Sequence, residues 1–135
     1  MKIQKMKHST IDIRIRLAET DPYGIAHHSN YFTWFEEGRF DYFEKNTYEV
    51  SDMKNNSDVV YCNLSIKCKF LKSVGFKDEI QVKTYMSQPS IYARYLFQQE
   101  IINKKTGEKV AECNSTMAGL SRKNWEIITL PEDEN

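Results

Sequence analysis

The sequence predicts an α+β fold in which one curved antiparallel sheet wraps around one long, buried helix. Two observations lead to this prediction. A segment rich in aromatic residues near the N-terminus has the period of an α-helix, and the later segments alternate apolar and polar residues with the period of two that is typical of β-strands. A sheet that curls around the helix is the simplest way to cover such a broad apolar face.

Length and composition predict one domain over residues 1–135, of which 40% are hydrophobic and 28% charged. The 19 Lys and Arg residues balance 19 Asp and Glu residues, which argues against binding through bulk electrostatics, so we expect no nucleic-acid partner. No apolar run is long enough to span a bilayer, and no apolar stretch follows the Lys-rich N-terminus. We therefore expect no membrane association, no secretory signal and a cytoplasmic location.

The first strand is predicted over residues 11–17, where four aliphatic residues alternate with three charged ones. A turn follows at residues 19–24, because Pro22 fixes φ and Gly24 permits positive φ. This turn leads into the segment that is predicted to form the helix.

The helix is predicted over residues 29–45. On a helical projection, one wide apolar arc contains Tyr31, Phe32, Trp34, Phe35, Gly38, Tyr42 and Phe43. Ser29 is expected to cap the helix, and Arg39, near the arc, to pair with a carboxylate. Gly38 costs about 1 kcal/mol relative to Ala in a helix. Either close packing against the sheet leaves no space for a methyl group at this position, or the helix keeps Gly38 despite its lower helix propensity.

Antiparallel strands are predicted over residues 61–70, 79–86, 91–102, 109–120 and 126–130. The alternation over 61–70 is continuous, so Cys62 and Cys68 are expected on one face, about 20 Å apart and beyond disulfide reach. The third cysteine is Cys113, and no C-x-x-C spacing occurs. The expected state of all three is a free, buried or half-buried thiol rather than a disulfide or zinc scaffold.

The candidate site is the segment 21–31, which brings a carboxylate, a tight turn and two histidines to the helix start. Unpaired N–H groups at a helix start stabilise an oxyanion, and the carboxylate of Asp21 is suited to act as a base or nucleophile. Alternatively, an Asp before Pro-x-Gly forms a turn by bonding its own backbone. His27 and His28 point in different directions and no other ligands stand out, so we expect no metal and no cofactor.

Residues 14–39 carry a resemblance to a known family. Their central string, Asp21-x-x-Gly24-x-x-x-His28-x-Asn30-Tyr31, resembles the signature of the hotdog-fold acyl-CoA thioesterases. The most similar group is the 4-hydroxybenzoyl-CoA thioesterase family, which includes the acyl-CoA thioesterases associated with the Tol-Pal system. The similarity extends over about residues 11–131.

The resemblance implies a hotdog fold that assembles as a homodimer, or as a dimer of dimers, with active sites at the dimer interface. It implies that Asp21 is the catalytic carboxylate and that the backbone N–H of His28 polarises the thioester carbonyl, while its imidazole has a supporting role. Gly24 would let the loop approach the thioester closely. The residues expected to contact the substrate, with the partner's strand near 66–70 helping to line the acyl pocket, are Tyr23, Ile25, Asn30, Tyr31, Ile66, Cys68 and Phe70.

The function expected from this resemblance is hydrolysis of an acyl-CoA or acyl-ACP thioester to a free acid and a thiol. The alternative is a non-catalytic hotdog module that binds acyl thioesters. The carboxylate of Asp21 separates the two hypotheses, because a binding module gains nothing from a carboxylate that faces a thioester carbonyl. A hotdog dehydratase is a minor third possibility, since no hydratase-type Asp/His arrangement is evident.

Overall fold

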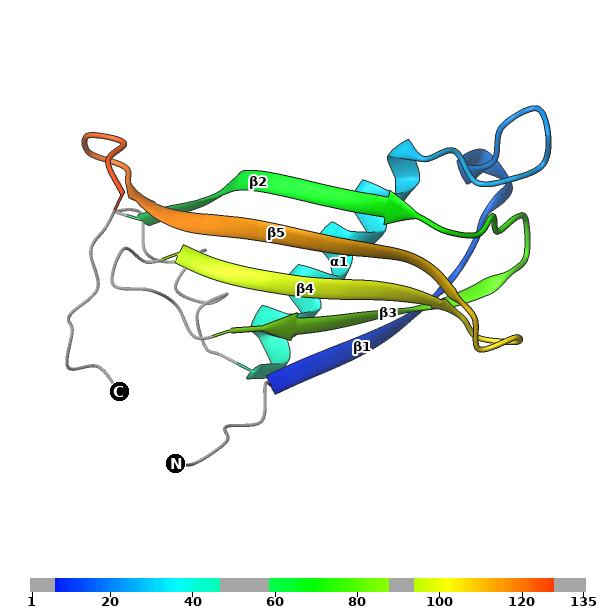
Figure 1. The fold of residues 1–135 in the computed structure, drawn as a ribbon. Helices are drawn as coiled ribbons and strands as arrows, with labels where there is room; N and C mark the ends of the chain where they lie inside the picture. The colour runs from blue at the N-terminus through cyan, green and yellow to red at the C-terminus, as the bar shows by residue number, and fades with distance from the viewer. Residues whose placement is uncertain (1–6, 47–58, 88–93, 128–135) are drawn as a thin grey trace.

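In the part of the chain that the structure describes, five strands form one antiparallel sheet and an α-helix lies against it (Figure 1). The structure is a computed structural model that describes residues 7–46, 59–87 and 94–127. The strand order is β1-β3-β4-β5-β2, so β1 and β2 are the two edge strands. The elements are β1 (Lys7–Arg14), the 3₁₀ helix η1 (Leu17–Glu19), α1 (Ser29–Asn46), β2 (Val59–Phe70), β3 (Glu79–Met86), β4 (Arg94–Asn103) and β5 (Lys109–Ser121).

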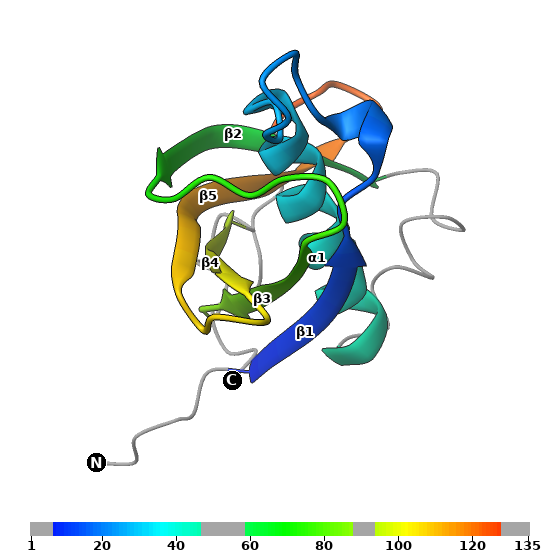
Figure 2. The same ribbon diagram turned by 90° about the vertical axis from the view of Figure 1, so that its right-hand side faces the viewer.

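The sheet curves around α1, which packs mainly against β1, β3 and β4 (Figure 2). Four aromatic side chains of the predicted arc fill the space between the helix and the sheet, each at most 2% exposed: Trp34, Phe35, Tyr42 and Phe43. Phe32 is an exception at 41% exposed, so its predicted burial is wrong. Its ring lies beside that of Phe70 on the edge strand β2, at 6.3 Å between centroids. The predicted α+β architecture, one curved antiparallel sheet around one long helix, is confirmed.

Several predicted strand boundaries differ in the structure, and the first strand begins earlier, at Lys7, and β2 earlier, at Val59. The first strand ends at Arg14 rather than at residue 17, because Leu17–Glu19 form η1 and Glu19 bonds back to the backbone N–H of Arg16. Within the described residues, the predicted final strand is reduced to a single bridge between Leu120 and Ile127. Residues 91–93 and 128–130 of the predicted strands fall outside the described residues.

The alternation along β2 is interrupted by a bulge. Asn63 pairs with Met117 and Ser65 with Thr116, which leaves Leu64 as an extra residue in β2. One extra residue moves the following side chains to the other face. The prediction that Cys62 and Cys68 share a face is therefore wrong.

The partner of Arg39 also differs from the prediction. Its guanidinium is buried at 4% exposed and donates to Oε1 of Gln99 at 3.0 Å, rather than to a carboxylate. The side-chain amide of Gln99 in turn donates to the carbonyl of Phe35 and to Oγ1 of Thr84, at 2.8 and 2.9 Å. Burial lowers the pKa of Arg39 from its ordinary value, because loss of hydration disfavours the charged guanidinium.

Gly38 lies where this network leaves no space for a side chain. A Cβ atom at this position would lie 2.7 Å from Oγ1 of Thr84, 2.8 Å from Cγ1 of Val82 and 2.9 Å from Nε2 of Gln99. Gly38→Ala is therefore expected to lower the melting temperature, because overpacking costs about 1–3 kcal/mol and exceeds the gain in helix propensity. Thr33→Ala on the exposed face of α1 is the control, since it changes helix propensity without this overlap. A higher melting temperature for Gly38→Ala would exclude the packing explanation.

Candidate active site

The segment between η1 and α1 folds into a small hairpin. Thr20 pairs with Ala26, and the amide of Asp21 donates to the carbonyl of Ile25 at 2.8 Å. The amide of Gly24 donates to the carbonyl of Asp21 at 3.0 Å, and Gly24 has a φ of 82°. This left-handed conformation strains any residue with a Cβ, which explains the Gly at this position.

The carboxylate of Asp21 stabilises this hairpin and also remains available. Its Oδ1 accepts hydrogen bonds from the amides of Tyr23 at 2.8 Å and Ile25 at 3.4 Å, so the turn-forming role left open by the sequence is present. Among the described residues, no hydrogen bond or ion pair engages Oδ2. One oxygen fixes the carboxylate and the other is open to a ligand.

The hairpin is also attached to the segment that follows β2. The amide of Ala26 donates to the carbonyl of Val74 at 2.7 Å, and Ile25 pairs with Gly75. A Cβ on Gly75 would lie 2.7 Å from the carbonyl oxygen of Gly24, so only Gly permits this close approach. Two separate parts of the chain thus hold the loop that carries Asp21.

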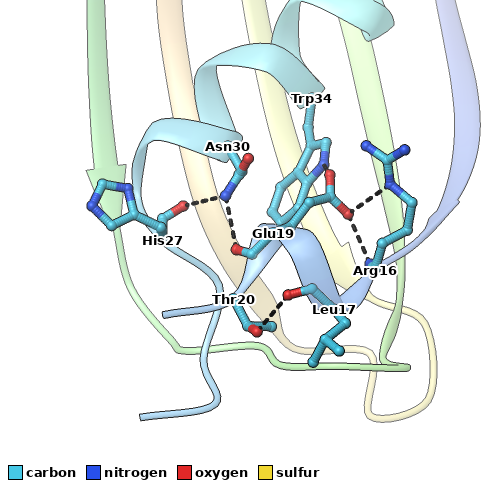
Figure 3. A network of polar contacts seen from close by, with 7 residues as sticks. All are labelled: Arg16, Leu17, Glu19, Thr20, His27, Asn30 and Trp34. Atoms are coloured by element: carbon cyan, nitrogen blue, oxygen red, sulfur yellow. Dashed lines mark hydrogen bonds and ion pairs between the residues drawn. The ribbon is translucent and has the colours of Figure 1, made fainter. Parts of the chain in front are cut away.

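A buried carboxylate, Glu19, connects the loop to the helix (Figure 3). Its Oε2 accepts from the indole of Trp34 at 2.9 Å, and its Oε1 accepts from the amide of Arg16 at 2.8 Å. Its backbone carbonyl accepts from the amide of His27 at 2.9 Å and from the side-chain nitrogen of Asn30 at 2.8 Å. Glu19 therefore joins η1, the loop and α1 at one point, two residues before Asp21.

The hydrogen bonds to Glu19 have a consequence for acid stability. Burial by itself raises the pKa of this carboxyl, but the hydrogen bonds from the Arg16 amide, the Trp34 indole and the Arg16 guanidinium together hold the pKa below its ordinary value. A lowered folded-state pKa adds stability above the unfolded-state pKa, and this stability is lost as the pH falls through the folded-state pKa.

Glu19→Gln is expected to lower the melting temperature at neutral pH, because it leaves one buried donor without an acceptor at a cost of about 1–3 kcal/mol. The difference from the wild type should shrink on acidification from about pH 6 to about pH 3, because the unfolded wild type binds a proton below its Glu pKa of about 4.3 and the stability that comes from the lowered folded-state pKa is then lost. Thermal melts at both pH values test this, with the exposed Glu37→Gln as the control. A difference that is constant or that grows on acidification would exclude the ionised network.

The start of the helix differs from the predicted cap. The hydroxyl of Ser29 lies 2.8 Å from Nδ1 of His27 rather than capping the helix, and this Nδ1 also accepts from the amide of Ser29 at 3.2 Å. The amides of Asn30 and Tyr31 donate to the carbonyls of His27 and His28 at 3.0 and 3.1 Å. Among the described residues, the amide of His28 has no acceptor, so it is the open donor at this helix start.

The rings of Phe70, Tyr31 and His28 form an aromatic group at the helix start, where the amide of His28 is open. The ring of Phe70 makes edge contacts with the rings of His28, at 6.2 Å between centroids, and Tyr31, at 5.1 Å. His28 also stacks on His27 at 4.3 Å. Tyr31 is 4% exposed and burial raises its pKa, whereas Phe70 is 47% exposed. Phe70 thus adjoins the helix start of its own chain, and a contribution from a partner's strand stays a prediction.

The remaining predicted site residues are less closely grouped. Tyr23 and Ile25 project from the hairpin at 88% and 41% exposed, and Ile66 lies along β2 at 38% exposed. Cys68 is half-buried against the core. Asn30 also donates to the carbonyl of His27 at 3.3 Å, so its side-chain nitrogen is engaged by the chain itself.

Sequence reasoning did not identify Glu19 or Gly75 as part of the site. Glu19 lies three residues after Arg16, in the spacing of a capping box, but the box normally begins with Ser or Thr. The spacing of Arg16 and Glu19 therefore matched a capping box, but the residue type at position 16 did not. For Gly75, the contact with Gly24 joins positions that are far apart in the sequence, and local patterns carry no such information.

The described residues contain neither a metal-binding cluster nor a membrane-spanning helix. No group of three or more His, Cys, Asp or Glu side chains in these ranges is placed to hold a metal ion. In the same ranges, no helix has both the length and the apolar character needed to cross a membrane.

Comparison with known proteins gives a consistent family. The sequence model of the thioesterase-like superfamily matches residues 15–133. A protein of Aquifex aeolicus named "Putative esterase" is 31% identical over 121 residues, which cover 89% of each chain. A solved DHNA-CoA thioesterase from Staphylococcus aureus is 28% identical with a TM-score of 0.79, covering 90% of this chain and 80% of that one.

A second solved structure extends the likeness of the fold. It is a 1,4-dihydroxy-2-naphthoyl-CoA thioesterase from Synechocystis, with a TM-score of 0.84 over 93% of this chain and 91% of that chain. At 15% identity this match bears on the fold alone. Since the superfamily model covers most of the sequence and the strand order and central helix agree with it, the chain belongs to the thioesterase-like superfamily and has its hotdog fold.

Proposed function

We propose that the chain hydrolyses the thioester of an acyl-CoA to a free acid and coenzyme A, with acyl-ACP as the alternative carrier. One observation carries the proposal: Asp21 is fixed through Oδ1 while Oδ2 stays open, in the loop that leads to an open amide at the helix start. Membership of the thioesterase-like superfamily and the name of the Staphylococcus aureus relative support a CoA thioester as substrate.

Asp21 acts as a general base or as a nucleophile. As a base, Oδ2 takes a proton from water while the water oxygen bonds to the carbonyl carbon. The C–S bond then breaks, and the leaving thiolate takes up a proton. As a nucleophile, Oδ2 itself bonds to the carbonyl carbon and expels the thiolate, and water then hydrolyses the resulting anhydride.

The amide of His28 donates to the carbonyl oxygen as negative charge develops on it, which favours the transition state over the ground state. Its availability supports this role, because the neighbouring amides of Ser29, Asn30 and Tyr31 already have acceptors. Gly24 lets the thioester approach the hairpin, since the space around its Cα is open. The imidazole of His28 has a supporting role through its packing on Phe70.

The substrate contacts are proposed to come from the hairpin, the helix start and β2, through Tyr23, Ile25, Tyr31, Ile66, Cys68 and Phe70. Asn30 adds its side-chain oxygen, because its nitrogen holds the loop. Within the superfamily we place the chain with the 4-hydroxybenzoyl-CoA thioesterase family and its Tol-Pal-associated branch, on the string from Asp21 to Tyr31.

The active protein is proposed to be a homodimer, or a dimer of dimers, with sites shared across the interface. The edge strand β2 supports this, since it exposes the apolar side chains of Leu64, Ile66 and Phe70. Long, unpaired apolar edges are normally covered in folded proteins.

A substrate screen tests the proposed reaction. Purified protein is incubated with short-chain, long-chain and aromatic acyl-CoAs and with an acyl-ACP, and free thiol is measured over time with a chromogenic disulfide reagent. At least one substrate is expected to release thiol well above the rate without enzyme. Tight binding of these thioesters with no thiol release from any of them would favour the non-catalytic binding module instead.

A further inference from the structure

Strands β2 and β5 bring two thiols into contact. Cys68 and Cys113 are directly opposite each other in the antiparallel register, and their Sγ atoms are 3.0 Å apart. The Cα atoms of directly opposed residues in antiparallel strands are separated by about 4.5–5.5 Å, which is within the range that a disulfide spans. The backbone therefore already has the arrangement that a bond between these sulfurs requires.

The surroundings of the two thiols differ in a way that orders their reactivity. Cys113 is 1% exposed within the core, whereas Cys68 is half-buried on the edge strand. Burial raises the pKa of Cys113, and its contact with Cys68 acts in the same direction, while the positive charge of Arg39 acts against both. Thiolates are the reactive species, so the more accessible Cys68 reacts first and Cys113 second.

We propose that Cys68 and Cys113 form an oxidisable dithiol that is converted by low-molecular-weight disulfides into an intramolecular disulfide between β2 and β5. The Cys68 thiolate attacks one sulfur of the oxidant, forms a mixed disulfide and releases the first small thiolate. Cys113 then loses its proton, attacks Sγ of Cys68 and releases the second. Two protein thiols are oxidised, one small disulfide is reduced to two thiols, and the protons pass to those thiols.

The third cysteine serves as an internal reference. The bulge at Leu64 lies between Cys62 and Cys68. Cys62 pairs with Ala118 and Cys68 pairs with Cys113, and these two partners are five positions apart along β5. Positions five apart on a regular strand face opposite sides, so Cys62 lies on the other face of the sheet from the pair. It is therefore expected to stay outside the disulfide.

The proposal does not depend on thioester hydrolysis, and the test uses the intact, folded protein. The protein is incubated with oxidised glutathione, the remaining thiols are alkylated, and non-reduced peptides are examined by mass spectrometry. The expected product has lost two hydrogen atoms and carries a Cys68–Cys113 cross-link with Cys62 alkylated. The melting temperature should rise by about 5 °C or more, because the bond restricts the unfolded chain, and dithiothreitol should reverse the rise.

Two variants make the result specific. Cys62→Ser is expected to form the same cross-link at the wild-type rate. Cys113→Ser is expected to stop at a stable glutathione adduct on Cys68, since the resolving thiol is absent. Wild-type protein that accumulates the glutathione adduct, cross-links Cys62, or keeps all three thiols free after prolonged exposure would overturn the proposal.

Discussion

Asp21→Asn is expected to reduce kcat at least about a hundredfold, the low end for loss of a general base or nucleophile, with little change in KM. The side-chain oxygen of Asn can still accept the hydrogen bonds from Tyr23 and Ile25 that form the hairpin. The substitution therefore removes the open carboxylate oxygen and keeps the turn. Steady-state thiol release on the best acyl-CoA substrate measures the effect.

Two further variants show whether the loss arises from chemistry or from structure. Asp21→Ala removes both functions of the side chain and is expected to lower the melting temperature as well as kcat, whereas Asp21→Asn should leave the melting temperature close to the wild-type value. Asp12→Asn removes an exposed carboxylate that pairs with Lys104 and should change neither quantity by much. Near-normal hydrolysis by Asp21→Asn would exclude Asp21 from the reaction.

Leu64→Asp is expected to abolish the dimer and hydrolysis together. Leu64 is 44% exposed on the edge strand β2, so its replacement hardly affects the folded monomer but puts a charge into the proposed apolar interface. If each site is completed by the neighbouring chain, activity follows association. Light scattering at micromolar concentration and the thiol-release assay are performed on the same sample.

The matched control is Leu96→Asp. Leu96 has a similar exposed fraction, 51%, but it lies on β4 and, opposite Thr116, faces away from the buried side of the sheet. This variant should keep the dimer and its activity. A monodisperse wild-type monomer with full activity would contradict both the shared site and the proposed role of β2.

Most of the fold could be predicted because two periodicities decide it. The helical arc with Trp34, Phe35 and Tyr42 and the alternation in β3, β4 and β5 both reflect burial on one side, which local sequence records. Phe32 and the bulge at Leu64 were mispredicted for a common reason. Both depend on how β2 is placed in the folded chain, through its pairing with β5 and its contact with Phe32, and the local pattern does not record this placement.

The candidate site was located from the sequence, but its internal connections were not. The string from Asp21 to Tyr31 indicated a turn and the helix start because turn residues and chemistry-bearing residues are contiguous there. The hydrogen bond from Trp34 to Glu19 joins residues 15 positions apart in the sequence. The contact of Cys68 with Cys113 joins residues 45 positions apart and depends on strand order and on the bulge. Such contacts follow from tertiary geometry, so periodicity cannot reveal them.

The central claim is that the open carboxylate oxygen of Asp21 carries out thioester hydrolysis at this helix start. The most direct measurement compares wild type and Asp21→Asn in two assays on one acyl group: calorimetric binding of a non-hydrolysable thioether analogue and single-turnover release of thiol from the thioester. Both proteins are expected to bind the analogue with similar affinity, while only the wild type releases thiol at an appreciable rate. Equal release rates for the two proteins, or binding by the wild type without any release, would contradict the claim.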